Sequence, residues 1–242
     1  MSNQWMFQIE LPLTAEQFQR LPRNGAYRYE YLAGKAYLSP WPRYYRALLD
    51  LPPPVEYLAE PNLTIWPMEI NQMDKLASLF SDAFSTVPPF GGLPDEERLD
   101  AARQALRHTQ SGGDGPWIRQ ASFIAGCSGE LFGAILVTLL PPESLLGFAH
   151  SRWQQVPPLD CIQRRLGIPH LTWIFVSPWH AGRGIGTALL QTACQELVKM
   201  GFRQLLSTFM SGNESSMLWH WRNGFRILSD SASDRSRAGS QR

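Results

Sequence analysis

From residue 63 onward, short apolar runs alternate with stretches in which apolar residues recur every three or four positions. Apolar runs bounded by turn residues are typical of buried strands, and the longer period is typical of helices that bury one face. The runs predict strands over residues 63–68, 121–127, 131–140, 171–176 and 205–210. The periodic stretches predict helices over residues 71–84, from residue 95, after residue 187 and over residues 213–224. This alternation predicts a mixed α/β domain with a central twisted sheet.

The first sixty residues have a different pattern, because all seven tyrosines lie between Tyr27 and Tyr57. Three of them alternate with charged residues ahead of an Ala-Gly turn, which predicts a half-buried hairpin with one aromatic face. Three prolines beginning at Pro52 then interrupt regular structure, since proline lacks a backbone donor and restricts the residue before it. The predicted organisation is an N-terminal appendage and linker over residues 1–62, an α/β domain over residues 63–228 and a polar, disordered tail over residues 229–242.

Composition adds few constraints and points to no large charged partner. The formal charge of +1 at pH 7 gives no net field that would attract nucleic acid or an anionic membrane, and no apolar run is long enough to span a bilayer. Cys127, Cys161 and Cys194 are far apart and form no Cys-x-x-Cys pair, so neither a disulfide framework nor a zinc site is expected. We therefore expect a cytoplasmic protein that binds no metal, no nucleic acid and no membrane.

A glycine-rich loop at residues 181–187 carries the first chemical signal. It follows the predicted strand 171–176 directly and opens the next predicted helix. Glycine permits positive φ, so successive N–H groups can converge on an anion at the positive end of the helix dipole. A Walker loop would need a lysine here, and a dinucleotide fingerprint would need a third glycine where Leu189 stands. The expected ligand is a phosphate or pyrophosphate group.

The loop resembles the pyrophosphate-binding signature of the GNAT acyltransferases, Arg/Gln-x-x-Gly-x-Gly/Ala after the fourth strand. The match runs through Arg183-Gly184-Ile185-Gly186, and the departure is at the first position, where this chain has Ala181. A side-chain contact would be lost there, and Arg183 or His180 are candidates to replace part of it. The resemblance implies the GNAT acyl-CoA N-acyltransferase fold with acetyl-CoA as the acyl donor.

The segment from Asn213 to Phe225 looks like the final helix signature of the same family. Asn213 suits an N-cap and Gly224 suits a left-handed terminator. The resemblance implies that Asn213 contacts the pantetheine arm and that the backbone of β-strand residues at 175 and 176 pairs with it. The implied donor-binding residues are Phe175, Val176, Ala181, Gly182, Arg183, Gly184, Ile185, Gly186, Thr187 and Asn213.

The position that faces the thioester sulfur is a tyrosine in many relatives, where it protonates the leaving thiolate, and here it is His220. The chain has no tyrosine from Pro61 onward. His220 could act as this acid, a tyrosine of the N-terminal hairpin could reach the site, or positioning alone could supply the rate. A histidine between two tryptophans also suits a partly buried packing position. No general base is assigned; the candidates are His170, Asp160, Glu143 and Glu130.

The resemblance implies an N-acetyltransferase that transfers an acetyl group from acetyl-CoA to a primary amine of a small molecule or protein. Specificity is expected in the insertion at residues 141–168, which shows no regular period. One alternative is a non-catalytic acyl-CoA-binding module, favoured by Ala181 and His220. Another is an interaction protein that binds a partner through its tyrosine-rich appendage. Neither the acceptor nor the oligomeric state follows from the sequence.

Overall fold

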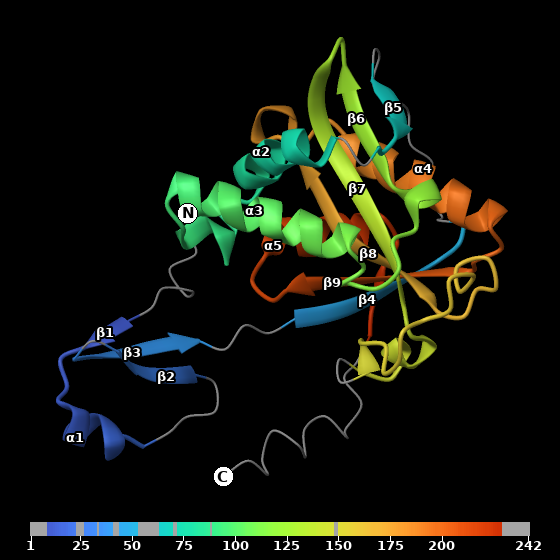
Figure 1. The fold of residues 1–242 in the computed structure, drawn as a ribbon. Helices are drawn as coiled ribbons and strands as arrows, with labels where there is room; N and C mark the ends of the chain where they lie inside the picture. The colour runs from blue at the N-terminus through green and yellow to red at the C-terminus, as the bar shows by residue number, and fades with distance from the viewer. Residues whose placement is uncertain are drawn as a thin grey trace. The chain divides into compact units, whose positions relative to one another are not determined.

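The computed structural model describes residues 9–22, 27–32, 34–40, 44–52, 63–69, 72–87, 89–147 and 150–228 (Figure 1). The chain forms two compact units, one of Met1–Tyr44 with Met210–Asn213 and the other of Tyr45–Phe209 with Glu214–Arg242. The predicted tail at residues 229–242 and residues 53–62 of the predicted linker lie outside the described residues. Each unit is considered by itself.

The first unit contains a small antiparallel sheet and one short helix. The strands are arranged in the order β1-β3-β2, and the predicted hairpin corresponds to β2 and β3, with Gly34 at φ 81° in its turn. A capping box at Thr14 begins the helix, and Phe18 of this helix lies 5.4 Å from the ring of Tyr31. The elements are β1 (Ile9–Leu11), α1 (Ala15–Gln19), β2 (Tyr27–Leu32) and β3 (Lys35–Pro40).

The second unit is built on a seven-stranded sheet in the order β10-β4-β9-β8-β7-β6-β5. The sheet is mixed, because β8 and β9 are parallel while β5–β6, β6–β7, β7–β8 and β4–β10 are antiparallel. The strands are β4 (Tyr44–Asp50), β5 (Thr64–Pro67), β6 (Phe123–Cys127), β7 (Glu130–Leu140), β8 (Ile168–Val176), β9 (Gln204–Met210) and β10 (Arg226–Ile227). This confirms the predicted mixed α/β class.

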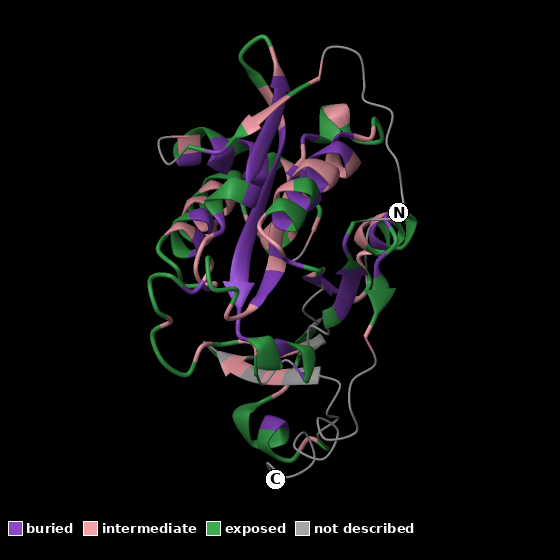
Figure 2. Cartoon of the chain, turned by 90° about the vertical axis from the view of Figure 1, so that its right-hand side faces the viewer, coloured by how far each residue is buried: buried purple, intermediate pink, exposed green. Residues whose placement is uncertain are grey.

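Helices cover both faces of this sheet. On β7, Leu136 packs with α2 and α3, whereas its neighbours Ile135 and Val137 pack with α4. A strand buried on both faces is apolar at every position, which explains the continuous apolar run in the sequence. Figure 2 shows the resulting buried band along the central strands. The main helices are α2 (Met73–Ala83), α3 (Asp95–Gln110), α4 (Ile185–Lys199) and α5 (Glu214–Arg222).

Strand β4 is a feature that the sequence pattern did not reveal. It precedes the proline run, in the region expected to be an appendage, yet it lies between β9 and β10 in the large sheet. Its residues Ala47, Leu48 and Leu49 are buried. The compact second unit therefore begins at Tyr45, before the start expected at residue 63. The apolar run of β4 is short and ends at Asp50, so local pattern alone could not place it in a sheet.

The burial of β4 can be tested with Leu49→Ala. Because Leu49 is 1% exposed, we expect this substitution to lower the free energy of unfolding by about 2–5 kcal/mol, measured by urea denaturation. The matched change Leu146→Ala, at a side chain 61% exposed, should stay within about 0.5 kcal/mol of the wild type. Equal effects of the two substitutions would contradict an interior position for β4.

Candidate active site

The parallel strands β8 and β9 separate shortly after they meet. They pair at His170 with Leu206 and at Leu171 with Ser207, and no further register joins them among the described residues. From residue 172 to residue 176, the backbone groups of β8 on this side therefore lack ladder partners on β9. Unpaired strand backbone can pair with the amides of an extended ligand.

A β-bulge marks the point of separation. On the other edge of β8, Leu136 pairs with Trp173 and Val137 pairs with Leu171, so Thr172 is the extra residue. A bulge leaves one residue unpaired, bends the strand and changes the direction of its side chain. The separation and the bulge together open the sheet beside Thr172.

The glycine loop lies between the end of β8 and the start of α4. Gly182 and Gly184 have φ angles of 79° and 78°, which glycine adopts at little cost. Gly184 is the N-cap of α4 and, being glycine, offers no side-chain acceptor to the first N–H groups of the helix. An uncapped helix N-terminus behind a glycine loop favours an anion.

The loop packs closely against its surroundings at Gly186. A Cβ atom at this position would lie 3.3 Å from Trp219 Nε1 and 3.7 Å from Val176 Cγ2. The small residue therefore lets the loop approach α5 and the end of β8. Ala181, Gly182 and Arg183 are exposed, whereas Ile185 is buried and anchors the first turn of α4.

The other predicted donor-binding residues are placed as follows. Phe175 and Val176 are the last residues of β8, and Phe175 is 4% exposed with its ring among those of α2. Their backbones lie on the part of β8 that has separated from β9. Asn213 lies in the turn before α5, where its N–H donates to the carbonyl of Met210 at 3.2 Å. The ring of His180 stacks on Phe132 at 3.9 Å.

His220 is buried, with both ring nitrogens in hydrogen bonds. Nδ1 lies 2.7 Å from the carbonyl oxygen of Ser216, and Nε2 lies 2.8 Å from the hydroxyl of Ser207. Because a carbonyl only accepts, Nδ1 carries the proton and Nε2 accepts from Ser207. Burial lowers the pKa of His220 to about 4, so the ring is neutral at pH 7.

These contacts place His220 directly behind the separation of the strands, since Ser207 is paired with Leu171. The ring also stacks on Phe209 at 4.3 Å between centroids. A neutral Nε2 that accepts a hydrogen bond has no proton to give, so this arrangement is the one expected of a packing residue. A role of His220 as an acid stays a prediction.

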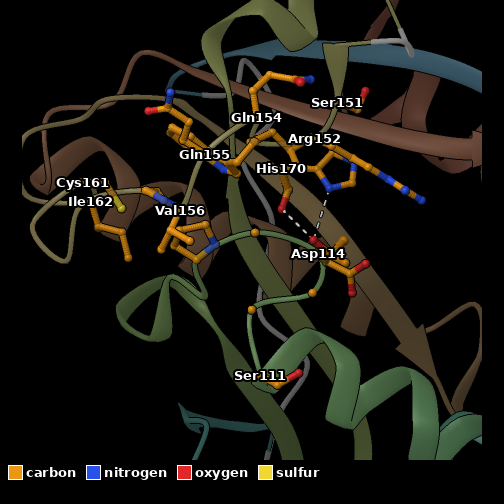
Figure 3. Close-up of a pocket in the computed structure, with 18 of the residues that line it drawn as sticks. Ser111, Asp114, Ser151, Arg152, Gln154, Gln155, Val156, Cys161, Ile162 and His170 are labelled. Atoms are coloured by element: carbon orange, nitrogen blue, oxygen red, sulfur yellow. Dashed lines mark hydrogen bonds between the residues drawn. The ribbon is translucent and has the colours of Figure 1, made fainter.

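A cavity of about 870 Å³ adjoins the separation point (Figure 3). It lies within the second unit and is lined by the end of α3 and the loop after it, by Leu140, by residues 151–159, 161 and 162 of the insertion, and by His170, Thr172 and Thr208. Of the base candidates named from the sequence, His170 lines the cavity, whereas Asp160, Glu143 and Glu130 do not.

Sequence reasoning missed three cavity residues, Asp114, Thr172 and Thr208. They come from segments far apart in the chain, and no motif contains them. The insertion was expected to carry specificity, and its exposed apolar residues Val156 and Leu159 do line the cavity. The cavity thus combines an apolar wall with a polar floor at the bulge, which is typical of small-molecule sites.

The family comparison agrees with this geometry. The family model described as the acetyltransferase (GNAT) family matches residues 94–225, more than half of the 242 residues. The chain therefore belongs to the GNAT acetyltransferase family. Its function is N-acetyl transfer from acetyl-CoA, to an acceptor that the family match does not identify. No curated protein matches the chain.

The chain is similar to several solved structures at low identity. A GCN5-related N-acetyltransferase from Sphaerobacter thermophilus is 16% identical, with a TM-score of 0.51 over 92% of this chain and 57% of that chain. PaiA N-acetyltransferase from Thermoplasma acidophilum, solved with coenzyme A, is 14% identical, with a TM-score of 0.48 over 71% of this chain and 94% of that one. The ribosomal-protein-S18-alanine N-acetyltransferase from Escherichia coli is 16% identical, with a TM-score of 0.44 over 69% of this chain and 79% of that chain.

Metal-binding clusters and membrane-spanning helices are both absent from the described residues. Within them, no group of three His, Cys, Asp or Glu side chains could hold a metal ion. None of the helices in the same part of the chain combines the length and apolar character needed to cross a bilayer. All three cysteines are free thiols.

Buried His220 and half-buried His170 predict how stability depends on pH. Burial lowers the pKa of both His170 and His220 from 6.5 to about 4. The unfolded chain therefore takes up protons first as the pH falls, and the free energy of unfolding should decrease between about pH 6.5 and pH 4. Each histidine should account for a loss on the order of 1–3 kcal/mol.

Urea denaturation at pH 7, 6 and 5 measures this dependence. His220→Phe keeps an aromatic ring on Phe209 and removes one titrating group, so its unfolding free energy should fall less steeply with pH than that of the wild type. The same pH slope in both proteins would show that His220 is not held neutral by the fold.

Proposed function

We propose that acetyl-CoA binds along the opening between β8 and β9, with its pyrophosphate on the glycine loop. The observation that carries this proposal is that the segment of β8 without partners on β9 leads through the glycine loop to the N-terminus of α4. The pantetheine amides would pair with the backbone of Phe175 and Val176. The N–H groups from Gly182 to Thr187 would hold the pyrophosphate.

Backbone groups supply most of this donor site, which accounts for the tolerance of alanine at the first position of the signature. Ala181 offers no side-chain donor, whereas the N–H groups of the loop do not depend on residue type. Arg183 is exposed beside the loop and would add a cationic contact to the phosphates. Asn213 stays a proposed contact of the pantetheine arm.

We propose that the amine acceptor occupies the cavity beside Thr172. The cavity volume of about 870 Å³ lies in the range of about 300–1,000 Å³ that is usual for small-molecule sites. This size favours a small primary amine, or the end of a chain, over an extended macromolecular surface. The acceptor nitrogen would reach the thioester at the point where β8 and β9 separate.

In this arrangement the amine attacks the thioester carbonyl and CoA leaves as a thiolate, in a single complex of both substrates. Holding the two reactants side by side supplies much of the rate, because it removes the entropic cost of a bimolecular encounter. His220 would support Ser207 at the separation point through the hydrogen bond between its Nε2 and the hydroxyl of Ser207. The cytoplasm, where acetyl donors and free thiols coexist, is the proposed location.

Calorimetric titration with acetyl-CoA tests the donor site. Wild-type protein should bind with micromolar affinity, and Gly184→Trp should weaken binding at least about 100-fold, because its side chain fills the space in front of the α4 N-terminus. Gly129→Trp is the matched control: Gly129 also has positive φ, at 89°, and no atom lies within 4 Å of a Cβ placed there.

The control separates blocking of the loop from backbone strain, which both substitutions introduce. Gly129→Trp should bind acetyl-CoA as the wild type does. Equal loss in the two variants would point to general destabilisation, and undiminished binding by Gly184→Trp would place the donor elsewhere.

A further inference from the structure

A line of hydroxyl and imidazole groups runs from the cavity into the sheet. Thr208 Oγ1 lies 3.1 Å from His170 Nε2, and His170 Nδ1 lies 3.1 Å from Thr172 Oγ1. Thr172 Oγ1 in turn lies 2.8 Å from Thr138 Oγ1, which donates to the backbone carbonyl of Asp114 at 2.9 Å. These groups come from β9, β8, β7 and the loop after α3, and Thr208, His170 and Thr172 line the cavity.

The order of these groups fixes the direction of every hydrogen bond. The line has four close contacts and four hydrogens, one each on Thr208, His170, Thr172 and Thr138. It ends at the carbonyl of Asp114, which only accepts, so Thr138 donates to it. Thr172 then donates to Thr138 at 2.8 Å, in preference to its longer contact of 3.3 Å with the carbonyl of His170. His170 then donates from Nδ1 to Thr172, and its Nε2 accepts from Thr208.

This assignment leaves the oxygen of Thr208 ready to accept a further hydrogen. Thr208 is half-buried, and His170 is the one hydrogen-bond partner of its hydroxyl among the described residues. In the alternative tautomer of His170, Nδ1 would accept from Thr172. Thr138 would then have one hydrogen for two contacts, so either its 2.8 Å contact with Thr172 or its contact with the carbonyl of Asp114 would have no hydrogen. The network therefore presents an acceptor to the cavity and a basic nitrogen directly behind it.

We propose that Thr208 and His170 together take the proton from the acceptor amine during acetyl transfer. This inference rests on the proposed acceptor cavity and deepens it. Thr208 touches the amine, and His170 acts through Thr208. As the bond from nitrogen to the acetyl carbon forms and the bond from carbon to sulfur breaks, the amine proton moves to Thr208 Oγ1, and the hydroxyl proton of Thr208 moves to His170 Nε2.

The step is balanced in protons. His170 becomes an imidazolium and later releases its proton to solvent through the cavity, while the CoA thiolate takes one proton from solvent. No oxidant, metal or further reactant is required. The hydrogen bond from Nδ1 to Thr172 is retained throughout, because a positively charged imidazole donates from both nitrogens.

The surroundings of His170 fit a proton acceptor. Burial lowers its pKa to about 4, so the ring is neutral at pH 7 and the electron pair of Nε2 accepts the hydroxyl hydrogen of Thr208. Of the charged and titratable side chains that line the same cavity, Asp114 favours a positive charge there, whereas Arg152 and protonated His108 oppose it. Asp114 is held by Thr109, whose hydroxyl donates to its carboxylate at 2.6 Å.

The test uses the full chain with acetyl-CoA and hydrazine, a nucleophile small enough to enter the cavity without specific contacts. Release of the CoA thiol gives kcat and the KM for acetyl-CoA. His170→Ala and Thr208→Val should each lower kcat by about 10²- to 10⁴-fold and leave the KM for acetyl-CoA unchanged. Thr208→Ser, which keeps the hydroxyl, should retain most of the rate.

Chemical rescue distinguishes proton transfer from a purely structural role. Free imidazole should restore part of the rate of His170→Ala, in proportion to its unprotonated form, and should not affect Thr208→Val. The matched controls are Thr192→Val, which removes a hydroxyl bonded to the carbonyl of Ala188 on α4, and His150→Ala at an exposed position. Both controls should keep the wild-type rate.

Calorimetry with acetyl-CoA on the same preparations separates the failure of this inference from failure of the donor site. Normal acetyl-CoA binding with unchanged kcat in His170→Ala and Thr208→Val would overturn the proton-accepting pair alone. A loss of rate in His170→Ala that imidazole does not restore would also overturn the pair. The pair would likewise be overturned if the wild type bound acetyl-CoA but did not acetylate hydrazine. Absence of acetyl-CoA binding in the wild type would overturn the donor site and the pair together.

Discussion

The separation of two parallel strands is the constraint on which the active site depends. Because β8 and β9 stop pairing after Leu171 and Ser207, the sheet exposes backbone groups that any buried strand must otherwise satisfy. The bulge at Thr172 opens the same point from the other edge of β8. The glycine loop follows at the end of the separated segment, and the cavity adjoins its beginning. The donor and acceptor sites that we propose therefore lie at the two ends of one opening in the sheet.

The features that sequence reasoning predicted are those set by local rules. Gly182 and Gly184 adopt positive φ, and α4 begins at Ile185, directly behind them, because only glycine enters that conformation at little cost. The strand, loop and helix order was therefore predictable, and with it the family that the comparison confirms. The apolar runs of β6 and β7 likewise predicted strands, since both faces of these strands are covered.

The features that sequence reasoning missed depend on contacts between distant segments. Strand β4 is short and lies before the proline run, so its place between β9 and β10 could be found only from its pairing partners. The polar lining of the cavity brings together Asp114, Thr172 and Thr208, which no local pattern connects. The state of His220 follows from Ser216 one helical turn away and from Ser207 on another element. A histidine in the usual place of a tyrosine could not reveal these partners by itself.

The central claim is that the donor completes the sheet where β8 leaves β9, and hydrogen exchange of the backbone measures this directly. With and without acetyl-CoA, exchange followed by mass spectrometry should show protection over residues 172–176 and 182–187. The hairpin of β6 and β7, whose amides are already paired, should not change. Protection confined to other segments, with residues 172–176 unaffected at saturating acetyl-CoA, would contradict the account.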